Sequence, residues 1–158
     1  MFEPQKSQSL QSKVSQSPVL DRMNSSRLSD TTTFWCKCGC CKHMDTENEN
    51  ICCTEIHNVS LKMSSNNLPC ISNHPGFRPV CLDKDSLQTA HHNYRELFGD
   101  HFNDKHEQYR YTAYRQFVRW CWGCLGRSIR VPLPSCVVNK IRKEFPEGTK
   151  TGFKPSEC

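Results

Sequence analysis

Twelve cysteines in a chain of 158 residues constrain this protein more than any other feature of its sequence. Four of them fall within six residues, in the segment Cys36-Lys37-Cys38-Gly39-Cys40-Cys41. Cysteine clusters either form disulfides, which need an oxidising compartment, or bind metal and carry redox chemistry in a reducing one. The choice between these two chemistries decides what kind of fold the chain can adopt.

The N-terminus favours the reducing alternative. Residues 1–6 open a Ser/Gln-rich stretch that lacks the apolar segment of a secretory signal. No run of the sequence approaches the ~18 apolar residues that a membrane span requires. We therefore expect an intracellular protein without a transmembrane segment, cytoplasmic or alternatively nuclear, in which the clustered cysteines bind metal.

A small apolar content is the second reason to expect a metal. Apolar side chains make up 35% of the chain and the mean hydropathy is −0.71, whereas an average soluble domain is roughly 45–50% apolar, counted there with glycine. A small domain with so thin a core needs additional cross-links. The net charge of +5 is compatible with nucleic acid, nucleotides or anionic lipid, and it selects none of them.

The chain divides into a polar tail and one domain. Residues 1–33 are rich in Ser, Gln, Asn and Thr, with apolar residues scattered singly, which predicts a disordered tail. Residues 34–158 are expected to form the domain. Its first part, residues 34–77, holds most of the clustered cysteines and few periodic apolar residues, so a metal would have to organise it.

Helical periodicity dominates the second part of the domain. Apolar residues at helical spacing predict helices over residues 87–98, 109–120 and 135–145. Asp83 or Asp85 can cap the first helix and Ser135 can cap the third, and we expect a polar link over residues 100–107. Residues 127–133 include Ile129 and Val131 and predict a short edge strand. The expected fold class is therefore α+β, in a helix-dominated small domain. The cysteine spacing and the resemblance described below add the expectation that a dinuclear cysteine–zinc centre organises this domain.

The spacing of the cysteines is typical of a zinc knuckle. Cys38 and Cys41 form a C-x-x-C pair, which brings two thiolates to one tetrahedral ion at ~2.3 Å. Gly39 relieves the tight turn between them. Cys52 and Cys53 are adjacent, so an unstrained disulfide between them is difficult, but they can serve two different ions.

Other cysteines and histidines allow more than one interpretation. Cys81, between Val80 and Leu82, is expected to be a buried apolar residue rather than a ligand. Cys121 and Cys124 form a second C-x-x-C pair, for which metal, redox and core roles remain equally open. A single histidine is more often structural or solvent-exposed than a ligand, and this applies to His43, His57 and His74.

Several strings of residues are similar to a known family. In chain order they are Trp35-Cys36-x-Cys38-Gly39-x-Cys41, Cys52-Cys53, Cys70, Ala113-Tyr114-Arg115, Trp120, Leu133-Pro134-Ser135-Cys136, Ile141-Arg142-Lys143-Glu144-Phe145-Pro146 and Gly152-Phe153-Lys154. Together they resemble the cytoplasmic C-terminal "ballast" domain of the ATP-gated P2X purinoceptor, subtype seven. The resemblance covers about residues 34 to 155.

This resemblance implies two kinds of ligand. One is a zinc centre, with two ions, whose ligands would be Cys38, Cys41, Cys52, Cys53, Cys70 and Cys136. The other is a guanine nucleotide, GDP or GTP, in a neighbouring pocket, with contacts at Arg110, Tyr114, Val131, Thr151 and Gly152. Cys36 matches a palmitoylated position of the family, and Cys136 would tie the knuckle to the third predicted helix, whose positive N-terminal end favours a thiolate.

The chain departs from the family pattern at several positions. A histidine of the nucleotide site is Tyr111 here, and the phosphate-side lysine falls on Glu147 or in a gap, where Lys143 or Lys150 would have to substitute. The segment between Cys53 and Cys70 also differs. The receptor's membrane spans and ATP-binding ectodomain have no counterpart, so the resemblance predicts a free-standing homologue of the domain.

The function predicted from the sequence is a non-catalytic, zinc-binding intracellular scaffold or regulatory module that binds guanine nucleotide. A catalytic zinc keeps an open coordination position, whereas a set of thiolates is typical of a closed structural site, so no enzyme is expected. The sequence does not identify a protein partner. The alternative is a zinc-dependent nucleic-acid-binding protein that uses the basic residues Lys140, Arg142 and Lys143.

Overall fold

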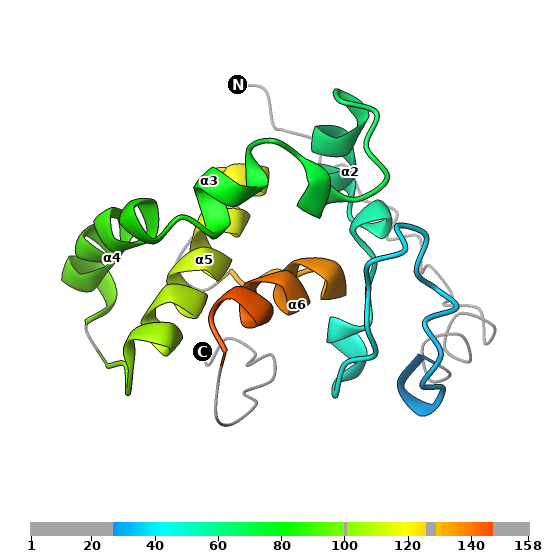
Figure 1. The fold of residues 1–158 in the computed structure, drawn as a ribbon, viewed down its shortest axis with the longest axis horizontal. Helices are drawn as coiled ribbons and strands as arrows, with labels where there is room; N and C mark the ends of the chain where they lie inside the picture. Colours follow the sequence, from blue (N-terminus) through cyan, green and yellow to red (C-terminus); the bar gives the residue numbers. More distant parts are fainter. Residues whose placement is uncertain (1–26, 100, 126–128, 147–158) are drawn as a thin grey trace, which may run out of the picture.

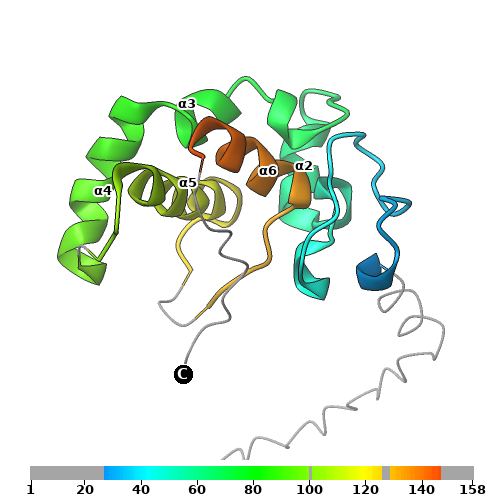
Figure 2. The same cartoon turned by 60° about the horizontal axis from the view of Figure 1, so that its bottom comes forward.

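A computed structural model of the chain describes residues 27–99, 101–125 and 129–146. This part of the chain is built from α-helices and short 3-10 helices (η) joined by loops (Figures 1 and 2). In chain order they are η1 (Glu47–Glu49), η2 (Cys53–Glu55), α2 (His57–Ser64), η3 (Ile71–Asn73), α3 (Phe77–Cys81), α4 (Lys84–Phe98), α5 (Lys105–Trp122) and α6 (Ser135–Glu144).

The expected α+β class is wrong, because no strand occurs in the residues that the structure describes. Residues 129–134 connect α5 to α6 without secondary structure. A strand needs a partner for its backbone groups, and Pro132 and Pro134 each lack an N–H. The β-branched Ile129 and Val131 therefore lie in a connection without secondary structure rather than in a sheet.

Two of the predicted helices, α4 and α5, are confirmed, with boundaries set by capping residues. The Asp83 side chain accepts hydrogen bonds from the N–H groups of Asp85 and Ser86 at 2.9 and 3.2 Å, at the start of α4. Asp104 accepts the N–H of Glu107 at 2.8 Å at the start of α5, so this helix begins inside the expected polar link. Each helix ends at a glycine with positive φ, a conformation that favours glycine.

The third predicted helix, α6, also forms, but its cap differs from the expectation. Pro134 occupies the N-cap position, and Ser135 is the first helical residue. Proline at a helix start is compatible with its fixed φ. The Ser135 side chain is consequently available for contacts outside its own helix.

Helix α6 lies between the two halves of the domain. It contacts α5 on the helical side and η2 and η3 on the cysteine-rich side, an arrangement visible in Figure 1. On the helical side α3 and α4 pack against α5, where Phe77 and Phe117 meet with their ring centroids 6.2 Å apart. One buried cluster runs without a break from these aromatic rings to the cysteines.

No helix in the described part of the chain combines the length and the apolar character that crossing a membrane requires.

Candidate metal centre

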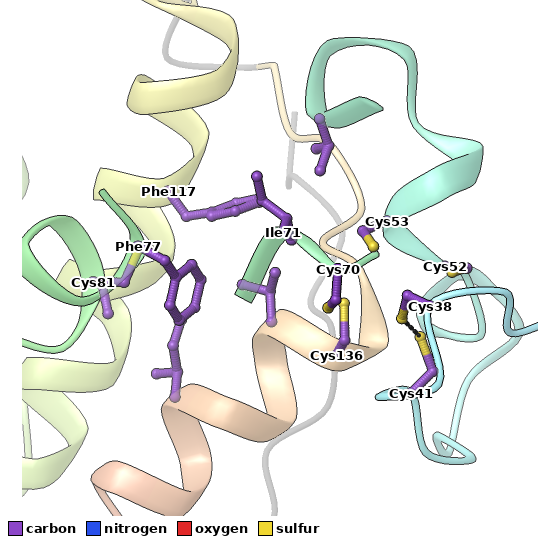
Figure 3. Packing of buried hydrophobic residues seen from close by; sticks show 14 of the residues in the cluster. Cys38, Cys41, Cys52, Cys53, Cys70, Ile71, Phe77, Cys81, Phe117 and Cys136 are labelled. Atoms are coloured by element: carbon purple, nitrogen blue, oxygen red, sulfur yellow. Dashed lines mark hydrogen bonds between the residues drawn. The ribbon is translucent and has the colours of Figure 1, made fainter. Parts of the chain in front are cut away.

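Cysteine sulfurs from four separate segments gather beside the N-terminus of α6 (Figure 3). All six predicted zinc ligands are buried, and Cys52, Cys53 and Cys70 have no exposed surface. They come from the loop at residues 36–41, the start of η2, the residue before η3 and the second residue of α6. Residues up to 98 positions apart in the sequence thus meet at one point.

The sulfurs form two groups of four that share one member. In each group the Sγ atoms all lie within 4.8 Å of one another. The first group is Cys36, Cys38, Cys41 and Cys52, and the second is Cys38, Cys53, Cys70 and Cys136. Cys38 belongs to both groups, so its thiolate is placed to bridge two ions.

The distances between sulfurs fit tetrahedral coordination of zinc. Four sulfurs held about 2.3 Å from a tetrahedral ion lie about 3.8 Å from one another. The Sγ atoms of Cys38 and Cys41 are 3.6 Å apart, and those of Cys36 and Cys38 are 3.7 Å apart. Both separations are far longer than the ~2.05 Å of a disulfide bond, so these cysteines are free thiols. A set of thiol ligands suits metals that prefer soft ligands, such as zinc.

Cys36 is a candidate ligand that the sequence reasoning missed. The resemblance assigned Cys36 to a palmitoylated position, whereas the structure places its sulfur in the first group of four. The C-x-C spacing between Cys36 and Cys38 was the available signal. Its side chain is half-buried, which makes it the most accessible sulfur of the seven.

The neighbouring thiols shift one another's pKa values in opposite directions. Hydrogen bonds with Cys41 and Cys53 hold the pKa of Cys52 below its usual range. Hydrogen bonds with Cys41, Cys53 and Cys70 raise the pKa of Cys136, although its place near a helix N-terminus favours the thiolate. A divalent cation bound at these sulfurs would displace the thiol protons, because metal binding releases protons from its thiol ligands.

Gly39 shapes the loop that carries three of the sulfurs. Its φ of +78° lies in the left-handed region that other residues rarely adopt. The turn directs the N–H of Cys40 toward the Sγ of Cys38, 3.4 Å away. Burial raises the pKa of the Cys40 thiol, and the neighbouring Cys70 and Cys36 thiols raise it further.

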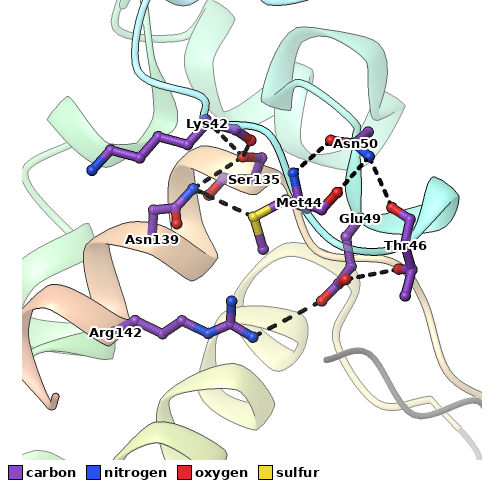
Figure 4. A network of polar contacts seen from close by, with 8 residues as sticks. All are labelled: Lys42, Met44, Thr46, Glu49, Asn50, Ser135, Asn139 and Arg142. Atoms are coloured by element: carbon purple, nitrogen blue, oxygen red, sulfur yellow. Dashed lines mark hydrogen bonds and ion pairs between the residues drawn. The ribbon is translucent and has the colours of Figure 1, made fainter. Parts of the chain in front are cut away.

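Ser135 holds two cysteine-bearing loops against α6 (Figure 4). Its hydroxyl accepts the N–H of Lys42 at 2.9 Å and donates to the Lys42 carbonyl at 2.5 Å. Its own N–H donates to the carbonyl of Ile51 at 2.9 Å. Lys42 follows Cys41, and Ile51 precedes Cys52, so one buried serine fixes both loops beside Cys136.

Asn50 keeps the connection between these two loops folded. Its side chain accepts the N–H of Met44 at 2.8 Å and donates to the carbonyls of Met44 and Thr46 at 3.1 and 2.9 Å. Asn50 is 1% exposed, so these contacts replace water at a buried amide. The connection is therefore organised by protein contacts as well as by sulfur.

Arg27 connects two segments of the cysteine-rich half through its contacts with Glu55 and Trp35. Its guanidinium donates to both carboxylate oxygens of Glu55, at 2.6 and 3.1 Å, and lies 5.7 Å from the centre of the Trp35 ring. Glu55 also accepts the N–H of Cys52 at 2.9 Å. Since Trp35 precedes Cys36, this arrangement links the segments of two ligand loops.

Cys81, Cys121 and Cys124 belong to neither group of sulfurs. Cys81 has no exposed surface and lies in the core, as the sequence predicted. Cys121 is half-buried at the end of α5, and Cys124 is exposed. The three histidines considered as ligands also lie elsewhere: the ring of His74 meets Trp120 edge-on at 4.9 Å, His43 contacts the carbonyl of Leu28 at 2.9 Å, and His57 is exposed at the start of α2.

The residues expected to contact a nucleotide are only partly described. Arg110 is 2% exposed and donates to the carbonyls of Phe145 and Pro146 at 2.8 and 3.0 Å. Tyr114 follows one turn later on α5, and Val131 lies in the connection before α6; both are half-buried. Thr151 and Gly152, like the phosphate-side positions at Glu147 and Lys150, fall outside the described residues.

Comparisons with known proteins agree with the resemblance seen in the sequence. The family model of the P2X purinoreceptor 7 intracellular domain matches residues 1–154. P2X purinoceptor 7 of Rattus norvegicus is 32% identical over 131 residues, which cover 76% of this chain and 20% of that protein. P2X purinoceptor 7 of Mus musculus is 29% identical over 129 residues, with the same two coverages.

The chain spans about a fifth of the length of these curated relatives. The family description is that of an intracellular domain, which confirms the location expected from the sequence. Because the family match extends over almost the entire chain, the chain belongs to the P2X purinoreceptor 7 intracellular domain family.

Proposed function

We propose that this chain is a non-catalytic scaffold module whose cysteines hold two zinc ions. The observation that supports the proposal is the pair of four-sulfur groups that share Cys38. Two tetrahedral ions with one bridging thiolate need seven sulfurs, and the two groups contain seven. A closed set of thiolates leaves no position for a substrate, so the metal is structural.

The burial of the sulfurs is the second support. Zinc sites of this kind contribute directly to folding, because the unfolded chain has no preformed site. The sulfurs join the segment at residues 36–53 to α6, and Cys70 and Cys136 lie within the same buried cluster as Ile71 and Val137. The metal would therefore act as an extension of a thin apolar core.

The test is the metal content of protein purified under reducing conditions. We expect two zinc ions per chain, and fewer than one would overturn the proposal. Replacement by cobalt or cadmium is expected to give the sulfur-to-metal charge-transfer absorption of thiolate coordination. This absorption distinguishes cluster-bound ions from ions held at surface carboxylates.

Three variants test how the sulfurs are shared. Cys36→Ser should remove a ligand from one ion, whereas Cys38→Ser should weaken both, because its sulfur belongs to both groups. Cys124→Ser is the matched control, since this exposed cysteine belongs to neither group. Equal metal loss in Cys36→Ser and Cys38→Ser would contradict the bridging role.

Guanine nucleotide binding stays a prediction from the resemblance. Arg110 is a poor probe of it, because its guanidinium donates to two backbone carbonyls and its replacement would disturb the fold. Tyr114→Ala is a better probe, since Tyr114 is half-buried. Titration of the wild-type chain with a fluorescent guanine nucleotide tests the prediction, and absence of saturable binding would remove it without affecting the metal proposal.

A further inference from the structure

A polar groove lies between α4 and α5, two helices that pack against each other (Figures 1 and 2). Its volume is about 610 Å³, which is within the range of ligand-binding pockets. The residues that line it include Asp85, Ala90, Asn93, Tyr94, Gln116 and Arg119. None of the lining residues belongs to either sulfur group, so the proposed metal function does not use this groove.

The buried part of the polar groove is held by Tyr94. This side chain is 7% exposed, and its hydroxyl donates to the carboxamide oxygen of Gln116 at 2.8 Å. The guanidinium of Arg115 lies 5.5 Å from the centre of the Tyr94 ring. These contacts fix a ring of α4 and an amide of α5 relative to each other, so this part of the groove is preorganised for a ligand.

Two carboxamides, one from each helix, line the polar groove. Asn93 is exposed, and its side chain offers both hydrogen-bond donors and an acceptor. The oxygen of Gln116 is used by Tyr94, which leaves its NH₂ group to donate to a ligand. A peptide group presents the complementary pair, one N–H and one C=O. The backbone of another polypeptide is therefore a suitable ligand for these two amides.

The charges that line the polar groove have both signs. Arg119 contributes an exposed guanidinium, and Asp85 contributes an exposed carboxylate. Nucleic acids and anionic membranes bind to several clustered Lys or Arg side chains, and a carboxylate in the same groove would repel them. One guanidinium is sufficient for a single carboxylate, which it can bind through two hydrogen bonds. These charges favour a partner with one acidic side chain.

The length and polarity of the groove favour an extended segment over a helix. Asp85 and Tyr94 are nine positions apart in α4, which corresponds to about 13 Å along the helix. An extended chain spans this distance with about four residues. Ala90 is the one lining residue whose side chain has no polar atom, whereas a helix that docks in a groove needs a larger apolar surface.

We propose that the polar groove binds an extended segment of about four residues from a partner polypeptide, with an acidic side chain of that segment paired to Arg119. Asn93 and Gln116 bind the backbone of the segment. The net charge of +5 adds a general attraction for an acidic partner. The inference goes beyond the proposed scaffold function by giving the class of its partner, and it involves no candidate zinc ligand.

The test is NMR spectroscopy of the full, isotope-labelled chain under reducing conditions, with two pools of tetrapeptides as probes. Every peptide is acetylated and amidated, so that its ends carry no charge. One position is glutamate in the first pool and glutamine in the second, and the other positions are mixtures. We expect the glutamate pool to shift the amide signals of residues 85–94 and 116–119 saturably. The glutamine pool should bind about fivefold more weakly, because it lacks the ion pair.

Two variants with matched controls test the assigned contacts. Asn93→Ala and Arg119→Met should each weaken binding of the glutamate pool about fivefold. Arg119→Met should also abolish the difference between the pools, because the ion pair is then absent with both. Gln88→Ala on α4 and Arg78→Met on α3 remove an exposed carboxamide and an exposed guanidinium outside the lining, and they should bind as the wild type does.

Absence of a saturable shift with both pools would overturn the proposal, and so would equal binding of the two pools to the wild-type chain. The same shifts with short single-stranded DNA, and none with the peptides, would also overturn it. The zinc content of the sample is measured separately. A chain without zinc that binds the glutamate pool would contradict the proposed metal function alone.

Discussion

At the scale of single residues, the candidate metal centre depends on side chains outside the two sulfur groups. Ser135 contributes a hydroxyl that both accepts from and donates to Lys42, and its backbone N–H holds Ile51. Asn139 adds a hydrogen bond to the Ser135 hydroxyl at 3.1 Å. The positions of the ligand loops are therefore set partly by buried polar contacts that supporting residues commonly provide around metal sites.

Ser135→Ala should destabilise the metal-loaded chain by about 1–3 kcal/mol, because the part-buried N–H and carbonyl of Lys42 both lose their partner. The variant should also bind zinc more weakly in competition with a chelator. Denaturant unfolding and the competition titration measure the two effects. Ser64→Ala, which removes an exposed hydroxyl on α2, is the control, and equal behaviour of the two variants would contradict this role for Ser135.

The raised pKa of the Cys121 thiol predicts that the folded chain loses stability at high pH. Burial raises the pKa of its thiol to about 12, whereas the thiol of the unfolded chain ionises near its ordinary value. Between these pH values the folded chain binds more protons than the unfolded chain, so the free energy of unfolding falls as pH rises. Below about pH 8.5 this contribution is fully present.

The measurement is denaturant unfolding of reduced protein at several pH values between 8 and 11. Cys121→Ala should lose less stability over that range than the wild-type chain, because it has no thiol to ionise on unfolding. Parallel curves for the two proteins would show that Cys121 does not contribute to the pH dependence.

At the scale of elements, α6 is held in place from both ends. Its first residues carry Ser135 and Cys136, and its C-terminal end is bound by Arg110 of α5 through the carbonyls of Phe145 and Pro146. Carbonyls at the end of a helix lack partners within the helix, so an external cation satisfies them. The helix thereby joins the cysteine-rich half to the helical half.

Arg110→Met should cost about 3 kcal/mol of stability, since the buried carbonyl of Phe145 and the part-buried carbonyl of Pro146 lose a charged donor. Thermal or denaturant unfolding measures this cost. Arg119→Met on the same helix is the control, because Arg119 is exposed, and its replacement should change stability by less than about 0.5 kcal/mol. A similar cost for both variants would argue against a special role of the Arg110 contacts.

At the scale of the whole molecule, the two halves of the domain have different sources of stability. The helical half has aromatic contacts of its own, such as Phe77 with Phe117. The cysteine-rich half has short 3-10 helices and one α-helix of eight residues, which is too short to be stable alone. Metal removal should therefore affect the two halves unequally.

Chelation under reducing conditions should increase amide hydrogen exchange in residues 36–73 and in the first turn of α6. Protection in α4 and α5 should remain close to that of the metal-loaded chain, because their mutual packing does not involve the sulfurs. Hydrogen exchange followed by mass spectrometry measures both regions in one sample. Equal loss of protection throughout would show that the metal supports the entire domain.

The sequence by itself determined the local features of this protein. Helical periodicity predicted α4, α5 and α6, and a capping residue predicted the start of α4 at Asp83, because both signals depend on neighbours a few residues away. The cysteine spacing predicted the knuckle at Cys38 and Cys41, and the resemblance supplied Cys70 and Cys136. The expected strand at residues 127–133 was wrong for its described part, because β-branched residues indicate a strand only where a partner strand exists.

Only the tertiary structure decided which distant groups meet. The place of Cys36 in the first sulfur group, the sharing of Cys38 and the tie from Ser135 to Lys42 join residues from separate loops. The tertiary structure also decided that the Ser135 side chain binds the backbone of Lys42 instead of capping α6. Such contacts form when folding brings together segments that long loops separate in the sequence. The order of residue types along the chain does not specify how far apart two such segments lie in space.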